Sequence, residues 1–69
     1  MDRLAVNSSN IISIGYDEAS STLEIEFKKG EVYEYFDVPS QVYDALMSAP
    51  SHGTYHNSNI RNQFRYQRI

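Results

Sequence analysis

The chain contains no cysteine and no tryptophan, and only three glycines and two prolines among its 69 residues. Without cysteine it forms no disulfide and no thiolate metal site, and enzymes with a thiol nucleophile are excluded. Three scattered glycines make no glycine-rich phosphate loop. No apolar run approaches the roughly 18 residues of a membrane span, and the first ten residues lack the apolar region of a signal peptide. These absences predict a soluble cytoplasmic protein that makes no contact with a membrane.

The composition is sufficient for one small hydrophobic core. Hydrophobic residues make up 41% of the chain and charged residues 22%, and both values are typical of globular proteins. A chain of 69 residues has no length for a second core. We therefore expect an N-terminal arm over residues 1–9, followed by a single domain over residues 10–69.

The net charge of −3 hides a division along the chain. Residues 1–44 hold all nine acidic residues and three basic ones, a net charge of −6. Residues 45–69 hold three arginines, two histidines and no acid, a net charge of +3 with neutral histidines. Such an asymmetry indicates a local anionic ligand or a partner with the opposite patch. A long duplex is disfavoured, because neutralising many phosphates needs many cations.

Alternation of apolar and polar residues predicts a small antiparallel sheet. Its clearest strand covers residues 22–28, where Leu23 and Ile25 would point inward. Phe27 would point inward as well, and the alternating Glu24 and Glu26 would face solvent. Gly30 supplies the positive φ of a hairpin turn after this strand. Further strands are predicted at residues 10–16 and 31–36, with a terminal strand at 64–69.

Two short helices are predicted between the third and the terminal strand. The first covers residues 40–49, capped by Ser40, with Leu46 on the face that packs on the sheet. The second covers residues 51–62 and is capped by Ser51. The predicted fold class is therefore α+β, a small antiparallel sheet of three to four strands packed with two short helices.

The order and spacing of these motifs resemble a known family. The residues that carry the likeness are Ser8-Ser9-Asn10-Ile11, Ile14-Gly15-Tyr16-Asp17, Thr22-Leu23-Glu24-Ile25-Glu26-Phe27, Gly30-Glu31-Val32-Tyr33-Glu34-Tyr35, Val38-Pro39, Val42-Tyr43, Leu46, Ala49, Ser51, Gly53, Tyr55, Asn57, Ile60-Arg61 and Tyr66. Together they resemble the KTSC domain, a module named for its place at the C-terminus of some lysyl-tRNA synthetases. This module also occurs as free-standing bacterial and phage-type proteins. The resemblance covers about residues 6–68 and implies a non-catalytic domain, for which RNA binding has been suggested.

Two positions depart from that family pattern. His56 stands where an aromatic residue usually precedes the asparagine, and Arg65 stands where a proline or a small residue is common. Both departures make the C-terminal segment more cationic.

The predicted second helix is the main candidate binding segment. Arg61 can hold a phosphate with two parallel N–H bonds, and Asn57 or Asn59 can bond a base edge or a ribose. Tyr55 lies on the same helix face as Asn59, at the i,i+4 spacing. Caps and ion pairs to the acidic half of the chain are the alternative roles of these polar residues.

Tyr33 and Tyr35 lie two residues apart on one strand, so they share a face of the sheet on which bases could stack. The alternative, which we favour, is that they pack across the strands against Phe27 or Tyr16, or lie covered beneath a helix.

Weaker candidates lie at both ends of the chain. Ser8 and Ser9, beside the amide of Asn10, could contact a phosphate, although a turn explains these residues as well. Arg65 could contact the same ligand as a tail cation. His52 and His56 stand at the i,i+4 spacing of metal ligands, but no third ligand is near in sequence, so no metal is expected. His56 is better interpreted as a phosphate contact whose charge depends on pH.

These residues predict a binding module and no enzyme, since no Ser/His/Asp spacing matches a catalytic arrangement. The expected ligand is a phosphate-bearing nucleobase compound, slightly favouring a small signalling nucleotide held stoichiometrically over single-stranded RNA, with no cofactor. The alternative is a protein–protein interaction domain without a nucleotide ligand. We also expect a homo-oligomer, because one domain of this size has little room for a pocket of about 300 Å³ or more.

Overall fold

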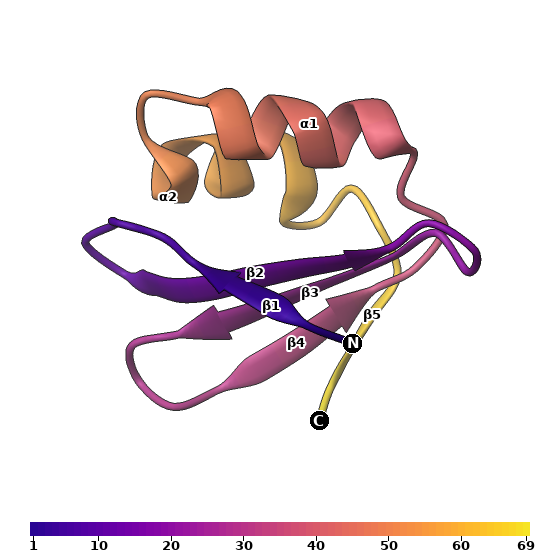
Figure 1. Ribbon diagram of the computed structural model, residues 1–69, viewed down its shortest axis with the longest axis horizontal. Helices are drawn as coiled ribbons and strands as arrows, with labels where there is room; N and C mark the ends of the chain where they lie inside the picture. Colours follow the sequence, from indigo (N-terminus) through magenta and orange to yellow (C-terminus); the bar gives the residue numbers. More distant parts are fainter.

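Five antiparallel strands form one sheet, and helices cover one of its faces, in a computed structural model that describes residues 1–69 (Figure 1). The strands follow one another across the sheet as β1 (Arg3–Ala5), β2 (Ile11–Asp17), β3 (Thr22–Phe27), β4 (Val32–Tyr35) and β5 (Tyr66–Arg68). The helical layer is α1 (Ser40–Ser48), α2 (His52–Tyr55) and a π-helical turn, η1 (His56–Ile60). This arrangement confirms the predicted α+β class.

The sheet has five strands, one more than the upper prediction. The additional strand β1 lies in the segment expected to form an arm, and its Leu4 pairs with Ile14 of β2. All three residues of β1 are exposed, so the strand has no buried face to produce an alternating pattern. Backbone hydrogen bonds to β2 hold the strand in place. Such bonds do not select residue types, so the three residues show no alternating pattern from which a strand could be predicted.

The core lies between the sheet and the helices. It consists of Ile11, Ile14, Leu23, Ile25, Tyr35, Val38, Leu46 and Ile60. The inward orientation predicted for Leu23 and Ile25 is confirmed, since neither is exposed to solvent. Leu46 of α1 is also fully buried, as predicted for the face of that helix that packs on the sheet.

The prediction that Glu24 faces solvent was wrong. Glu24 points to the sheet face opposite the helices but is only 6% exposed, and its carboxylate pairs with the guanidinium of Arg3. Arg3 also donates from Nε to Ser13 Oγ at 3.1 Å, and Ser13 donates to Glu26 at 2.8 Å. The N-terminal residues cover the acidic strand and satisfy its carboxylates internally.

Gly15 allows this cover to form. A Cβ added at Gly15 would lie 2.8 Å from the carbonyl oxygen of Asp2 and 3.0 Å from Cγ of Arg3. Only a residue without a side chain lets the N-terminal segment approach β2 so closely.

The turn and cap predictions were partly right. Gly30 has a φ of 95° in the β3–β4 turn, and the Ser51 side chain accepts a hydrogen bond from the Thr54 amide, as predicted. The cap prediction for Ser40 was wrong, because α1 begins at Ser40 itself and Pro39 is the residue before it, without a side-chain cap. None of the helices is long and apolar enough to cross a bilayer.

An aromatic pair fixes one end of α1 to the sheet. Tyr43 of α1 stacks on Tyr16 of β2 with ring centroids 4.9 Å apart and planes 11° apart. The Tyr16 hydroxyl donates to the carbonyl oxygen of Val38 at 2.6 Å. Tyr16 therefore links α1 to the sheet. Its ring does not pack against Tyr33 or Tyr35 of β4, which was one of the alternatives considered from the sequence.

Candidate functional site

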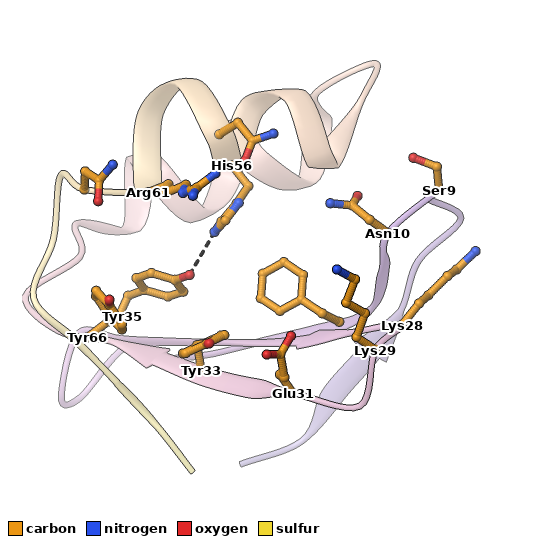
Figure 2. Close-up of a pocket in the computed structure, with 13 residues that line it drawn as sticks. Ser9, Asn10, Lys28, Lys29, Glu31, Tyr33, Tyr35, His56, Arg61 and Tyr66 are labelled. Atoms are coloured by element: carbon orange, nitrogen blue, oxygen red, sulfur yellow. Dashed lines mark hydrogen bonds between the residues drawn. The ribbon is translucent and has the colours of Figure 1, made fainter.

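A cleft of about 620 Å³ lies between the sheet and the segment formed by α2 and η1 (Figure 2). It is lined by Ser9, Asn10, Phe27, Lys28, Lys29, Glu31, Tyr33, Tyr35, His56, Asn57, Arg61, Asn62 and Tyr66. Small-molecule sites commonly measure about 300–1,000 Å³. The expectation that one domain has little room for such a pocket was wrong, because the gap between the two layers supplies it within a single chain.

Aromatic side chains form the floor of the cleft. Tyr33 packs edge to face against Phe27, with ring centroids 5.8 Å apart, and against Tyr66 of β5 at 5.6 Å. The packing of Tyr33 on Phe27 is the interpretation favoured from the sequence, and Tyr33 lines the cleft as well. Tyr66 is 55% exposed at the edge of the sheet. The floor thus offers tyrosine surface to a planar group.

A buried polar pair forms the back wall of the cleft. The Tyr35 hydroxyl lies 2.8 Å from Nε2 of His56, which reaches down from the helical layer (Figure 2). Burial raises the pKa of Tyr35 to about 12, with Tyr33 and Tyr66 adding to the effect and Arg61 opposing it. The phenol therefore stays protonated under all ordinary conditions.

His56 adds no positive charge to the cleft at neutral pH. Burial lowers its pKa below the ordinary value, the neighbouring Asn57 side chain opposes that shift, and Arg61 adds to it. Its Nδ1 atom is buried without a hydrogen-bond partner. His52 instead places Nδ1 2.8 Å from the Leu46 carbonyl oxygen. The two imidazoles thus contact different groups, and the structure contains no cluster of three or more His, Asp or Glu side chains that could hold a metal ion.

The π-helical turn places the polar residues of the helical layer on the cleft. The Arg61 amide donates to the His56 carbonyl oxygen at 2.9 Å, five residues back. The helical segment ends at Ile60, and Asn62 follows Arg61 with a φ of 65°. Asn57, Arg61 and Asn62 therefore share the cleft wall. The sequence predicted one continuous α-helix here, and wide turns of this kind occur often at functional sites.

The cleft is cationic although the chain is acidic. Lys28, Lys29 and Arg61 are three of the six basic side chains of the protein, and Glu31 is the one acid of nine in the lining. The charge division along the sequence assigned both lysines to the acidic half. The fold brings the turn after β3 beneath the helical segment, so cations from both halves meet around one cavity.

Six of the ten residues predicted as ligand contacts line this cleft. They are Ser9, Tyr33, Tyr35, His56, Asn57 and Arg61. The other four lie outside it. Tyr55 and Asn59 border a separate, shallower hollow of about 300 Å³ beside the end of α1, and Asn59 donates to the Tyr55 carbonyl oxygen at 3.3 Å.

Ser8 and Arg65 have local roles. The Ser8 hydroxyl accepts hydrogen bonds from the backbone amides of Asn10 and Ile11, at 3.4 and 3.3 Å, which is the turn role considered from the sequence. Arg65 lies 5.2 Å from the centre of the Phe36 ring and 3.9 Å from the Asp37 carboxylate. Neither residue belongs to the lining of the cleft.

Seven lining residues are not among the ten predicted as ligand contacts. They are Asn10, Phe27, Lys28, Lys29, Glu31, Asn62 and Tyr66. Lys28 and Lys29 could have been predicted as lining residues, because they directly follow Phe27, which faces inward at the end of a strand. Asn10 was considered only beside Ser8 and Ser9 before the first strand, and a tertiary contact fixes its position. A Cβ added at Gly53 of α2 would overlap the Asn10 side-chain oxygen Oδ1, so a larger residue at position 53 would displace the Asn10 amide.

Known proteins resemble this chain over its whole length. Residues 7–64 match the KTSC domain. A protein of Stutzerimonas stutzeri (strain A1501) is 43% identical over 70 residues, which cover 100% of this chain and 99% of that protein. A lysine–tRNA ligase of Nostoc punctiforme is 39% identical over 66 residues, which are 96% of this chain but 12% of the ligase. The crystal structure of a KTSC domain protein from Yersinia pestis matches with a TM-score of 0.94 at 39% identity, covering 99% of this chain and 96% of that one.

Proposed function

This chain belongs to the KTSC domain family, and on that premise we propose that its cleft is a non-catalytic binding site for a small phosphate-bearing nucleobase compound. One observation carries the proposal: the cleft combines three cationic side chains with an exposed tyrosine surface, in a protein whose net charge is −3. Few cations, concentrated around one cavity, suit a small anion better than an extended polyanion.

The cations serve the phosphate groups. Arg61 offers a planar fork of N–H donors that matches a phosphate with two parallel hydrogen bonds. Lys28 and Lys29 offer compact, mobile charges on the turn between β3 and β4. All three side chains belong to exposed residues, so they can adjust to a ligand.

The aromatic and amide groups serve the base and the sugar. Tyr33 and Tyr66 give a planar base a surface to stack on, and stacking contributes about 1–3 kcal/mol per base. The amides of Asn57 and Asn62 can donate to and accept from a base edge or a ribose hydroxyl. His56 is engaged by Tyr35 and supports the wall, so binding without conversion is the role that these groups favour.

The lining comes from one chain, so the proposed site does not depend on the homo-oligomer expected from the sequence. A domain that holds one small nucleotide per chain would act stoichiometrically, as a sponge for a signalling compound or as its sensor.

A second candidate is binding of single-stranded RNA. The observation that favours it is the identity of 39% to a segment of a lysine–tRNA ligase, an enzyme that acts on RNA. Stacking tyrosines and a cationic wall would suit an unpaired nucleotide as well.

The test is a thermal-shift and calorimetry panel of mononucleotides, cyclic dinucleotides, cyclic ADP-ribose-type compounds and short RNAs. A ligand at 100 times its Kd adds about 2.7 kcal/mol to the free energy of unfolding. In a domain of this size we expect the midpoint to rise by about ten degrees. Arg61→Gln should abolish the rise, whereas Arg65→Gln removes the same charge outside the cleft and should retain it.

The outcomes separate the candidates. A response to one small nucleotide, with weak dependence on salt, supports the proposed function. A response to RNA alone, with affinity falling by a slope of about −0.7 per phosphate neutralised, moves the assignment to RNA. A flat panel overturns both candidates and favours the protein-interaction alternative.

A further inference from the structure

The cations of the cleft stand at its two ends. Lys28 and Lys29 lie on the β3–β4 turn at one end, and Arg61 lies at the other end above Tyr35 (Figure 2). The charge of Arg61 acts on the phenol of Tyr35, which agrees with this position. Tyr33 lies on the floor between the two ends.

The length of β4 and of the residue before it gives the distance between the two cationic ends of the cleft. Residue 31 stands at the lysine end and residue 35 at the arginine end, and four strand steps of roughly 3.3 Å span about 13 Å. One phosphate would contact both ends only if the lysine and arginine side chains were both fully extended toward the middle of the cleft. The long lysine and arginine side chains can both lean inward, so an intervening nucleoside can bring a separate phosphate to each end.

Each end carries a formal charge of +1. The two lysines share their end with Glu31, and Arg61 has no acid beside it in the lining. An amide accompanies the cation at each end as well. Asn62 follows Arg61 in the chain. Asn10 lies beside Lys28, whose main-chain amide donates to the main-chain carbonyl oxygen of Asn10 at 2.9 Å. The two ends are thus similarly equipped, with an aromatic surface between them.

We infer that the cleft recognises a nucleotide unit that carries phosphate groups on both sides of its nucleoside, one for each cationic end. The inference rests on the proposed function and names its ligand class. A nucleoside 3′,5′-bisphosphate has this chemistry, and so does one nucleotide inside single-stranded RNA. A diphosphate chain would place both phosphates at one end and leave the cations of the other end without an anion.

The test compares two ligands with equal numbers of phosphates. The 3′,5′-bisphosphates of adenosine, guanosine, cytidine and uridine are titrated by calorimetry against the 5′-diphosphates and 5′-monophosphates of the same nucleosides. For the preferred base, the bisphosphate should bind at least ten-fold more tightly than the diphosphate. If the diphosphate binds as tightly as the bisphosphate, the inference fails while the proposed function stands. If none of these compounds and no cyclic nucleotide binds, the small-nucleotide function itself fails.

Variants test the two ends separately. Arg61→Gln and the double variant Lys28→Gln/Lys29→Gln should each reduce bisphosphate affinity to about that of the monophosphate in the wild type. Arg65→Gln is the matched control and should leave it unchanged. All of these side chains belong to exposed residues, so unfolding midpoints close to the wild type will show that the fold is intact. Loss of affinity from only one end would overturn the two-ended geometry.

A final arm distinguishes the source of the ligand. A single-stranded tetranucleotide RNA of the preferred base is titrated beside the free bisphosphate. Tighter binding of the RNA by ten-fold or more assigns the cleft to an RNA nucleotide, and equal or weaker binding assigns it to the free compound. Either result supports the two-phosphate inference, provided that both ends still respond to substitution.

Discussion

The Tyr35 hydroxyl and Nε2 of His56 are 2.8 Å apart, and this contact joins the fourth strand to the helical layer. Each residue is only 5% exposed. Burial favours the neutral form of both groups, raising the pKa of Tyr35 and lowering that of His56. The result is an uncharged hydrogen bond behind the cleft, so the positive charge around the cavity comes from its arginine and lysines.

Removing the Tyr35 hydroxyl should destabilise the fold. Tyr35→Phe leaves Nε2 of His56 buried without a partner, and we expect the free energy of unfolding to fall by about 1–3 kcal/mol, measured in urea. Tyr33→Phe is the control, because the Tyr33 hydroxyl makes no hydrogen bond, and it should change stability by less than about 0.5 kcal/mol. Equal effects of the two variants would contradict a structural role for the contact.

His56 should make stability depend on pH in a defined window. The unfolded imidazole has a pKa of about 6.5, and burial between Tyr35 and Phe27 lowers the folded value. Between those two values the unfolded chain binds one more proton, so the free energy of unfolding decreases as the pH falls below about 6.5. The decrease ends below the folded pKa, and His56 contributes no slope at higher pH.

Urea unfolding between pH 5 and 8 measures this dependence, with His56→Gln as the comparison. The variant keeps a polar group near Tyr35 but cannot titrate, so the difference between the two curves removes the contribution of the carboxylates. Parallel curves would mean that His56 titrates normally in the folded protein.

The pair formed by Arg3 and Glu24 should contribute more than a surface ion pair. The Glu24 side chain is 8% exposed and that of Arg3 30%, so Arg3→Met leaves a nearly buried carboxylate without its partner. We expect a loss of about 1–3 kcal/mol in the free energy of unfolding. A double-mutant cycle with Glu24→Gln should show that the two losses are not additive. Arg68→Met, on the exposed strand β5, should have an effect below about 0.5 kcal/mol.

Gly53→Ala tests the contact that positions Asn10. Alanine favours a helix over glycine by about 1 kcal/mol, but the added methyl would overlap the Asn10 side chain. We expect little net stabilisation from the single substitution, together with reduced nucleotide affinity, because Asn10 must move within the cleft.

In an Asn10→Ala background the same substitution should raise the free energy of unfolding by about 0.5–1 kcal/mol, since nothing then opposes the methyl. If Gly53→Ala stabilises both backgrounds equally, the overlap with Asn10 is not the controlling contact.

The sequence predicted the parts of the fold that repeat over several residues or rest on turn chemistry. Leu23 and Ile25 reveal β3 by alternation, Leu46 lies on the apolar stripe of α1, and Gly30 marks its turn. The helical segment after Ser51 was found from its cap and the proline before it. Each of these signals is local, so it is visible without knowledge of what packs against it.

The features that were missed depend on contacts between distant residues. Glu24 occupies a position whose pattern indicates solvent, but the N-terminal segment reaches back over Gly15 and buries it. Lys28 and Arg61 lie 33 positions apart in the sequence but line the same cavity, because the helices return over the sheet. No spacing rule connects such residues, so two of the three cations of the cleft were not assigned to the site.

The lining of the cleft begins at Ser9 and ends at Tyr66. The walls therefore exist only after the first and last thirds of the chain have been brought together across the sheet. A peptide fragment cannot reproduce the site, and local opening of either terminal region would dismantle it. A bound molecule would contact both terminal regions of the chain and stabilise them together. It should therefore slow amide exchange throughout the domain rather than only beside the ligand.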